Sequence, residues 1–281
     1  MTYLKKPCGA FLRSTNKNQI NSLELGISKG TINIAARGSI GIETKGRKDM
    51  EQTHRSSTID MPSVREESDM NVYLKPTFTI ESDHDQIIET AKKIIRDCQT
   101  DTERAIRLCY FVRDMIYYNV NMVSLFEEDF KATATLEWQQ GYCVQKAVLL
   151  TALGRAAGIP TRLAFAKIKN HQVSPDILQR LGTNIFPRHG YNQFYLNGRW
   201  INVAATFNKT LCEKMNWPTV EFDGENDSIL ASEDLGGKPY IEYIEKFGHK
   251  GDLPFQWIKD RIIKMVGADK RPVPIDLPKK T

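Results

Sequence analysis

The chain has 281 residues, of which 41% are hydrophobic and 26% are charged, a composition typical of a globular protein with one large domain or two small ones. No apolar run approaches the roughly 18 residues that a membrane-spanning helix needs, and the first residues lack the apolar core of a secretory signal. We therefore expect a cytoplasmic protein with no membrane partner.

The net charge of +5 is concentrated at the two ends of the chain. Residues 1–72 carry a net +3 and residues 249–281 a net +4, whereas the middle of the chain is slightly acidic at −2. No basic stripe with interleaved aromatic residues occurs, and this argues against nucleic acid as a partner.

The five cysteines are odd in number and widely spaced, and no C-x-x-C motif occurs. This pattern argues against a disulfide framework and against a cysteine-rich zinc site. We expect reduced thiols, as in a cytoplasmic protein, and no metal or organic cofactor.

Composition divides the chain into three parts. Residues 1–72 are predicted to be a partly disordered extension, in which an alternating stretch at 31–44 is typical of a small hairpin. Residues 73–272 carry the regular patterns and are predicted to form the domain. Residues 273–281 are predicted to be a disordered tail.

Two helices are predicted before residue 117 from their start signals and apolar spacing. Asp83 with Gln86 has the spacing of a capping box, and apolar residues then recur at helical intervals. Thr100 with Glu103 repeats the same signal at the start of the second helix.

A third helix is predicted from just after Cys143 to about Ala157. Gly158 supplies its C-terminal stop, and Pro160 prevents continuation. Residues 161–168 then read as a strand.

The strongest hairpin signal lies at 190–207, where Asn197 and Gly198 suit a two-residue type I′ turn. Two further helices are predicted at 239–247 and at about 254–266. Helices followed by antiparallel strands indicate an α+β domain.

Cys143 is the first candidate for chemistry, because it follows Gly141 and opens a helix. Unpaired N–H groups and the helix dipole favour negative charge at that position, which would lower the pKa of the thiol. The Cys143 amide is also placed to donate to a developing oxyanion. A cysteine at a helix start is nevertheless more often structural than catalytic.

His189 is the candidate base, since a nucleophile and its base need be adjacent only in the fold. The Asn197–Gly198 turn sets the hairpin register, and counting back from it puts His189 opposite Thr206. A histidine at the start of a central strand can point toward a helix N-terminus. The alternative reading is a hydrogen-bonded surface histidine.

Two stretches together resemble the transglutaminase-like superfamily. One is 141–162, with the pattern GxCxxKAxLLxALxRAxGIPxR, and the other is the histidine-bearing hairpin at 189–200. The resemblance covers about 73–250 and is strongest to a prokaryotic subgroup that continues with segments like 205–208 and 221–224. It implies a papain-like α+β fold in which the nucleophile helix packs on an antiparallel sheet.

The resemblance also implies a Cys-His-Asp triad. Cys143 matches the nucleophile and His189 the base. The usual aspartate lies four residues after the hairpin tryptophan, where this chain has Ala204.

Three readings of the third position stay open. Asn208 is ranked first, because it has the right parity on the predicted strand and an amide oxygen can hold an imidazole N–H. Asp223 or Asp227 from the following loop is the second reading. The third is that Cys143 and His189 act as a dyad, or are inactive.

Further side chains are expected near the cleft, although solvated-loop or core roles compete for each of them. An oxyanion amide is expected from Gln139 or Gln140, and cleft-lining roles from Trp138, Tyr142, Tyr191 and His171. His171 is also the fallback base. A metal site of Cys143, His171 and His189 is disfavoured, since no paired-ligand spacing occurs.

The predicted activity is acyl transfer through a Cys143 thioester, with His189 as the base and hydrolysis of an amide or peptide bond preferred to transamidation. The predicted partner is a peptide or another amide-bearing substrate. The alternative from a different class is a catalytically degenerate module that binds a peptide or other ligand in the old cleft.

Overall fold

The computed structural model describes residues 69–277. The hairpin predicted at 31–44 lies outside these residues. None of the described helices is long and apolar enough to cross a membrane.

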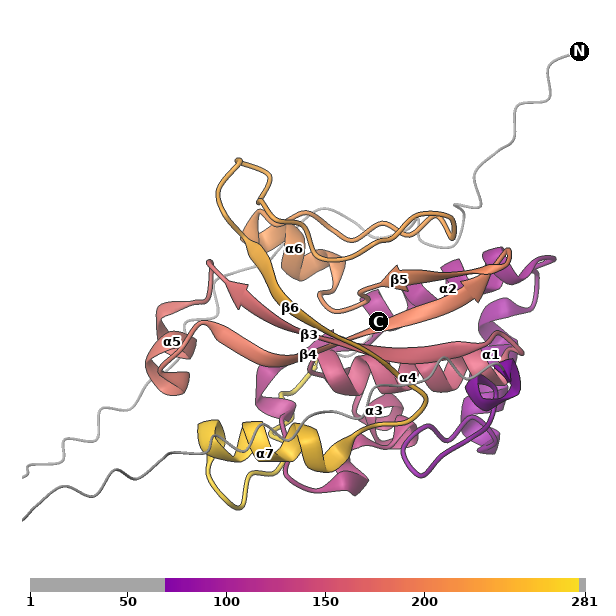
Figure 1. Cartoon of the computed structure of the whole chain (residues 1–281), viewed down its shortest axis with the longest axis horizontal. Helices are drawn as coiled ribbons and strands as arrows, with labels where there is room; N and C mark the ends of the chain where they lie inside the picture. The colour runs from indigo at the N-terminus through magenta and orange to yellow at the C-terminus, as the bar shows by residue number, and fades with distance from the viewer. Residues whose placement is uncertain (1–68, 278–281) are drawn as a thin grey trace, which may run out of the picture. The chain divides into compact units, whose positions relative to one another are not determined.

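Seven α-helices and six β-strands occur within the described residues (Figure 1). The helices are α1 (Asp85–Ile95), α2 (Asp101–Met115), α3 (Ala132–Trp138), α4 (Cys143–Ala156), α5 (Pro175–Leu181), α6 (Lys209–Met215) and α7 (Phe255–Val266). The strands are β1 (Tyr117–Tyr118), β2 (Gln140–Gly141), β3 (Thr161–Asn170), β4 (Ile185–Leu196), β5 (Arg199–Val203) and β6 (Ile241–Lys250). Three short 3₁₀ turns add η1 (Met70–Tyr73), η2 (Val120–Met122) and η3 (Glu127–Phe130).

The start of α2 follows its sequence signal. The Thr100 hydroxyl accepts from the Glu103 N–H at 3.2 Å, and the Glu103 carboxylate accepts from the Thr100 N–H at 3.3 Å, which completes the capping box. At α1 the predicted N-cap, Asp83, differs by one residue from the observed one. His84 caps this helix, its Nδ1 accepting from the Gln86 N–H at 3.2 Å.

The main sheet has four antiparallel strands in the order β5-β4-β3-β6. Asn197 and Gly198 form the predicted turn between β4 and β5, with φ of 51° and 82°. The predicted register is confirmed as far as the pair Asn192–Val203, where β5 ends. His189 therefore lies beyond β5 and does not face Thr206.

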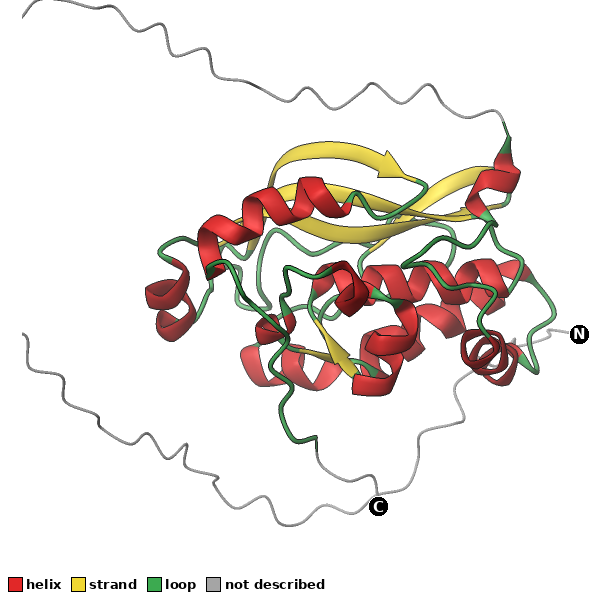
Figure 2. Ribbon diagram, turned by 90° about the horizontal axis from the view of Figure 1, so that it is seen from below, coloured by secondary structure: helices red, strands yellow, loops and turns green. Residues whose placement is uncertain are grey.

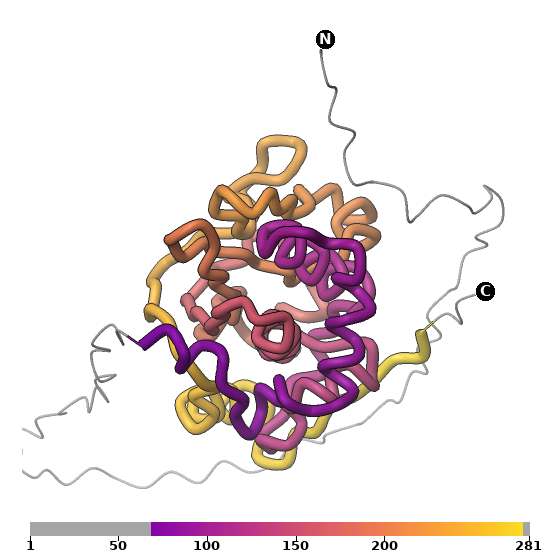
Figure 3. Tube along the Cα trace, turned by 90° about the vertical axis from the view of Figure 1, so that its right-hand side faces the viewer, coloured from indigo at the N-terminus to yellow at the C-terminus, as the bar shows by residue number. Residues whose placement is uncertain are grey.

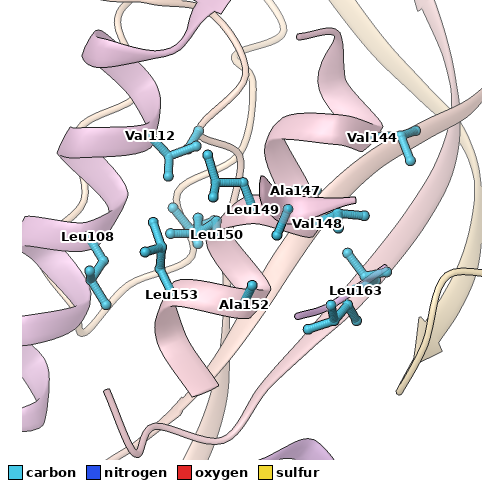
Figure 4. Packing of buried hydrophobic residues seen from close by; sticks show 14 of the residues in the cluster. Leu108, Val112, Val144, Ala147, Val148, Leu149, Leu150, Ala152, Leu153 and Leu163 are labelled. Carbon is cyan, nitrogen blue, oxygen red and sulfur yellow. The ribbon is translucent and has the colours of Figure 1, made fainter. Parts of the chain in front are cut away.

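Helix α4 packs against one face of this sheet, and α1, α2 and α3 pack against α4 on that side (Figure 2). Seen along the fold, α4 is enclosed by the other elements (Figure 3), and every residue from Val144 to Arg155 is buried. Figure 4 shows its apolar side chains beside Leu108 and Val112 of α2 and Leu163 of β3. This core fixes the helix whose first residue is Cys143.

A second core covers the opposite face of the sheet, where α6 lies (Figure 1). It is rich in aromatic residues, and the rings of Trp217 and Tyr240 stack with centroids 4.9 Å apart. Ala204 and Tyr191 belong to the same cluster.

The helix predicted at 239–247 is wrong, because this segment forms β6, an edge strand paired with β3. Its apolar residues recur at intervals of three and four, which imitates a helix. Pairing with β3, about 80 residues earlier in the chain, decides the structure instead. Charged side chains such as Glu245 and Lys246 are exposed on this strand, as edge strands commonly show.

The tail predicted at 273–281 is ordered as far as the structure describes it. The Asn121 carbonyl accepts from the Val273 N–H at 3.0 Å. Gln140 binds the backbone of Ile275 at two points, through Oε1 at 3.0 Å and Nε2 at 2.9 Å. Residues 273–277 of this tail thus contact the domain through their backbone.

Candidate active site

Cys143 begins α4, as predicted, and its side chain is partly exposed. The Gln145 side chain braces the turn before it, because Oε1 accepts from the Tyr142 N–H at 3.1 Å and Nε2 donates to the Asp129 carbonyl at 2.8 Å. A Cβ on Gly141 would lie 3.1 Å from the Gln145 Cβ, so a side chain there would push against this brace.

Three backbone N–H groups donate hydrogen bonds to the Cys143 sulfur, those of Gly190, Val144 and Cys143 itself. They favour the thiolate, but burial outweighs them and raises the pKa of the thiol to about 11. The expectation of a lowered pKa is therefore wrong. Cys143 rests as a neutral thiol.

His189 lies on β4 next to a bulge, paired with Ala166 of β3. Its ring is stacked on Tyr191, with centroids 6.0 Å apart, and meets Tyr243 edge-on at 6.1 Å. Burial lowers the pKa of His189 to about 4, so the imidazole is neutral at pH 7. Its Nε2 is buried and has no hydrogen-bond partner among residues 69–277.

Residue 190 joins the two candidate residues. Gly190 faces α4 so closely that a Cβ there would lie 3.1 Å from the Cα of Val144. Side chains alternate along a strand, so His189 and Tyr191 face the second core. Because the Gly190 N–H donates a hydrogen bond to the Cys143 sulfur, the backbone next to His189 contacts the nucleophile.

The third triad position lacks a carboxylate. Ala204 is fully buried just after the end of β5. Asn208 is engaged elsewhere, because its Oδ1 accepts from the Tyr118 N–H at 3.2 Å and its Nδ2 donates to the Thr210 hydroxyl at 2.6 Å. The assignment of Asn208 as orienting residue for His189 is therefore corrected.

The two loop aspartates are engaged away from His189, Asp223 within its own loop and Asp227 with strand β5. Asp223 accepts from the backbone N–H groups of Glu225 and Asn226 at 2.8 and 2.7 Å. Asp227 accepts from the backbone and side-chain N–H groups of Asn202 at 2.8 and 2.6 Å. Neither carboxylate is bonded to His189, which matches the orphaned Nε2.

A pocket of about 380 Å³ opens above Cys143. Of the predicted cleft residues, Tyr142 lines it and Trp138, Tyr191 and His171 do not. His171 lies in a separate hollow and pairs with Glu242 at 3.1 Å. The fallback role of His171 as base has no support in this placement.

The two glutamines before Cys143 do not form an oxyanion site. Gln139 is exposed and adopts the left-handed conformation that ends α3, with φ of 53°. Gln140 is buried and uses its amide on Ile275 and on Asn119, whose Nδ2 donates to Gln140 Oε1 at 2.8 Å. Both side chains are therefore corrected to structural roles.

The sequence analysis did not predict three aromatic rings near the site, nor the three basic side chains that line its pocket, Arg180, Arg188 and Lys270. These three cations are called the basic rim. Tyr118 lines the pocket, Tyr243 packs on His189, and Trp257 lies under Arg188. They come from β1, β6 and α7, elements far from the Cys143 motif in sequence. Only the tertiary fold brings them there, so no local pattern could have identified them.

The described residues contain no group of three or more His, Cys, Asp or Glu side chains that could hold a metal ion. The candidate metal set of Cys143, His171 and His189 is thus not brought together.

Residues 88–205 match the family model of the transglutaminase-like superfamily. No curated protein matches the chain. A candidate cysteine protease from Cytophaga hutchinsonii is similar in structure, with 18% identity, a TM-score of 0.41 and coverage of 68% of this chain and 57% of its own. The periplasmic domain of TgpA from Pseudomonas aeruginosa shows 15% identity, a TM-score of 0.35 and coverage of 49% and 47%. This chain thus spans little more than half of the first of these structures.

Proposed function

We propose that this chain, whose residues 88–205 form a transglutaminase-like core, is a cysteine-dependent enzyme that hydrolyses an amide or peptide bond through a thioester on Cys143. One observation carries the proposal. Cys143, partly exposed at the start of α4, lines a pocket of about 380 Å³. Its sulfur accepts a hydrogen bond from the N–H of Gly190, the residue after the buried His189.

The pair would start neutral. As the Cys143 sulfur attacks the carbonyl carbon, His189 would turn from the second core toward the sulfur and take the thiol proton, so that no separated charge exists before the attack. The Cys143 N–H, which donates to the sulfur at rest, would donate to the oxyanion as it forms. The protonated imidazole then gives its proton to the leaving amine.

Water, or an amine in a transamidation, would resolve the acyl-enzyme. Water is the preferred acceptor in this proposal. The choice is measured directly by adding butylamine during turnover and comparing the amounts of free acid and N-butylamide that form.

The proposal is tested with an activated ester, which acylates a nucleophile even where the natural substrate is unknown. The protein is mixed with p-nitrophenyl acetate, quenched in acid, and its peptides are weighed by mass spectrometry. We expect an acetyl group on the Cys143 peptide and its loss in Cys143→Ala. His189→Asn should slow acylation by about 10²-fold or more, whereas His171→Asn, in the separate hollow, should leave the rate unchanged.

The second candidate function is a degenerate module that binds a peptide without turning it over. Ala204 at the acidic position and the orphaned Nε2 of His189 favour it. In that case the acetylation rate of Cys143 does not exceed that of glutathione, and the Cys143→Ala variant binds its ligands as the wild type does. That pair of results would eliminate the enzyme.

A further inference from the structure

The pocket above Cys143 combines apolar walls with a basic rim. Its apolar wall residues are Val120, Val123, Leu181, Phe186, Pro187, Ile262, Met265 and Val266. Three basic side chains also line it, Arg180, Arg188 and Lys270, and no Asp or Glu does. The described lining therefore carries positive charge without a resident carboxylate.

None of the three cations has an ion-pair partner within the described part of the chain. Arg180 makes no ion pair there, and the Lys270 ammonium donates only to the Arg271 carbonyl, at 2.8 Å. Burial and the nearby charge of Arg180 both lower the pKa of Lys270. Two like charges that face one pocket are unfavourable until an anion neutralises them.

The third cation is held in place by aromatic rings. The Arg188 guanidinium carbon lies 3.6 Å from the ring centroid of Trp257 and 4.6 Å from that of Phe247. Its NH1 donates to the Pro187 carbonyl at 2.9 Å, and its Nε is buried without a partner in the described residues. Stacking thus fixes this charge at the wall.

The position of the pocket connects the rim to chemistry. Cys143 and Tyr142 lie in the lining, and the cations come from α5, β4 and the segment after α7. A ligand whose apolar part fills the 380 Å³ and whose anion meets the rim would have its remaining atoms beside the sulfur.

We propose that this pocket selects substrates in which an apolar group carries an anion, a carboxylate or a phosphate, that is bound by Arg180 and Lys270 while the apolar part contacts α7. This selectivity rests on the proposed function, because it describes the substrate class of that enzyme. The binding preference itself is independent of turnover.

The preference is tested by alkylating Cys143 with two reagents of similar size and opposite character, iodoacetate, which is an anion, and iodoacetamide, which is neutral. Rates are read from the Cys143 peptide by mass spectrometry, with glutathione measured alongside. We expect the iodoacetate to iodoacetamide rate ratio to exceed that of glutathione and to fall as salt is added.

Two rim variants and one control give the sharpest comparison. Arg180→Gln and Lys270→Gln should each lower this ratio by roughly threefold to tenfold. Lys264→Gln removes the same charge from the exposed surface of α7, away from the lining, and should leave the ratio unchanged. A ratio that equals that of glutathione, or falls equally in all three variants, overturns the proposal.

Protection by small ligands distinguishes the two sources of the anion. Octanoate and octyl phosphate should slow the alkylation of Cys143 by iodoacetamide at lower concentrations than 1-octanol does, and the better of the two identifies the preferred anion. Equal protection by 1-octanol contradicts the proposal. These measurements need only a reactive thiol, so failure of the ester acylation would leave them interpretable.

Discussion

The backbone N–H of Gly190 donates a hydrogen bond to the sulfur of Cys143, so strand β4 and helix α4 meet at the candidate nucleophile. This contact has two consequences. The residue before Gly190 is the candidate base, so the strand that carries the base also contacts the nucleophile. The sulfur also already accepts N–H groups before any substrate arrives, so its reactivity depends on the balance between these donors and burial.

The first prediction concerns the pH dependence of Cys143 alkylation. Because burial raises the pKa of the thiol to about 11, its reaction with iodoacetamide should still be increasing with pH at pH 10. An ordinary thiol, with a pKa of about 8.5, levels off near pH 10. Glutathione in the same reaction is the control, and a profile for Cys143 that levels off below pH 8 would contradict the buried, neutral thiol.

The second prediction concerns acid stability through His189. The folded-state pKa of about 4 lies below the ordinary value of 6.5, so the unfolded chain binds more protons between those values. Stability from this residue is present above pH 6.5 and is lost as pH falls toward 4, up to about 3 kcal/mol. Urea unfolding at pH 4.5 and 7 measures the difference.

His189→Phe should reduce that pH dependence, because a phenyl ring has nothing to protonate. His171→Phe is the control, since His171 is exposed and lies in a separate hollow. If both variants keep the wild-type difference between pH 4.5 and 7, another group is responsible.

The third prediction restores the missing carboxylate. Ala204 lies in the same buried cluster as Tyr191, on which His189 stacks. Ala204→Asp should raise the pKa of His189, since a nearby negative charge favours the imidazolium, and should speed acylation of Cys143 by about tenfold or more. The pH profile of ester acylation measures both effects.

Ala204→Asn has nearly the same shape without the charge and is the control for it. Both variants should be less stable than the wild type, because each buries a polar group in an apolar cluster. A gain in rate that occurs equally in the Asn and Asp variants would point to repacking. No gain in either variant would mean that a third residue at position 204 does not assist His189.

Local signals in the sequence predicted the elements that carry the site. The turn at Asn197–Gly198 and the stop at Gly158 are each decided within a few residues, so the hairpin and the helix from Cys143 were found. The partners of His189 were not found. They depend on where β5 ends and on β6, which pairs with β3 from about 80 residues away. The alternation of side chains along one strand predicts neither of these.

The same limit applies to charge. A cysteine at a helix start suggests a low pKa when only the helix is considered. The protein around the partly exposed Cys143 nevertheless desolvates its thiol and raises the pKa instead. Gln140 looked like an oxyanion donor because it precedes Cys143 closely. Its amide instead donates to the backbone carbonyl of Ile275, 135 positions later in the chain, and no local sequence pattern predicts that contact.

The fourth prediction concerns a charge that the mechanism does not use. Lys146, one turn after Cys143 on α4, is fully buried, and its ammonium donates to the carbonyls of Arg113 and Ile116 at 3.1 and 2.5 Å, at the end of α2. Burial lowers its pKa from 10.5 to about 7. Replacing it with methionine leaves both carbonyls unpaired, and we expect a loss of about 1–3 kcal/mol for each.

The pH dependence separates this role from simple packing. Between pH 7 and 10.5 the unfolded chain keeps the Lys146 proton and the folded chain has released it, so stability from this residue rises with pH across that window. Lys146→Met should remove that rise, whereas Lys214→Met, at an exposed position on α6, should keep it. Urea unfolding at pH 6.5, 8 and 9.5 measures the slope. An unchanged slope in Lys146→Met would mean that Lys146 keeps its proton inside the fold, and that the end of α2 is bound by an ammonium ion at every pH measured.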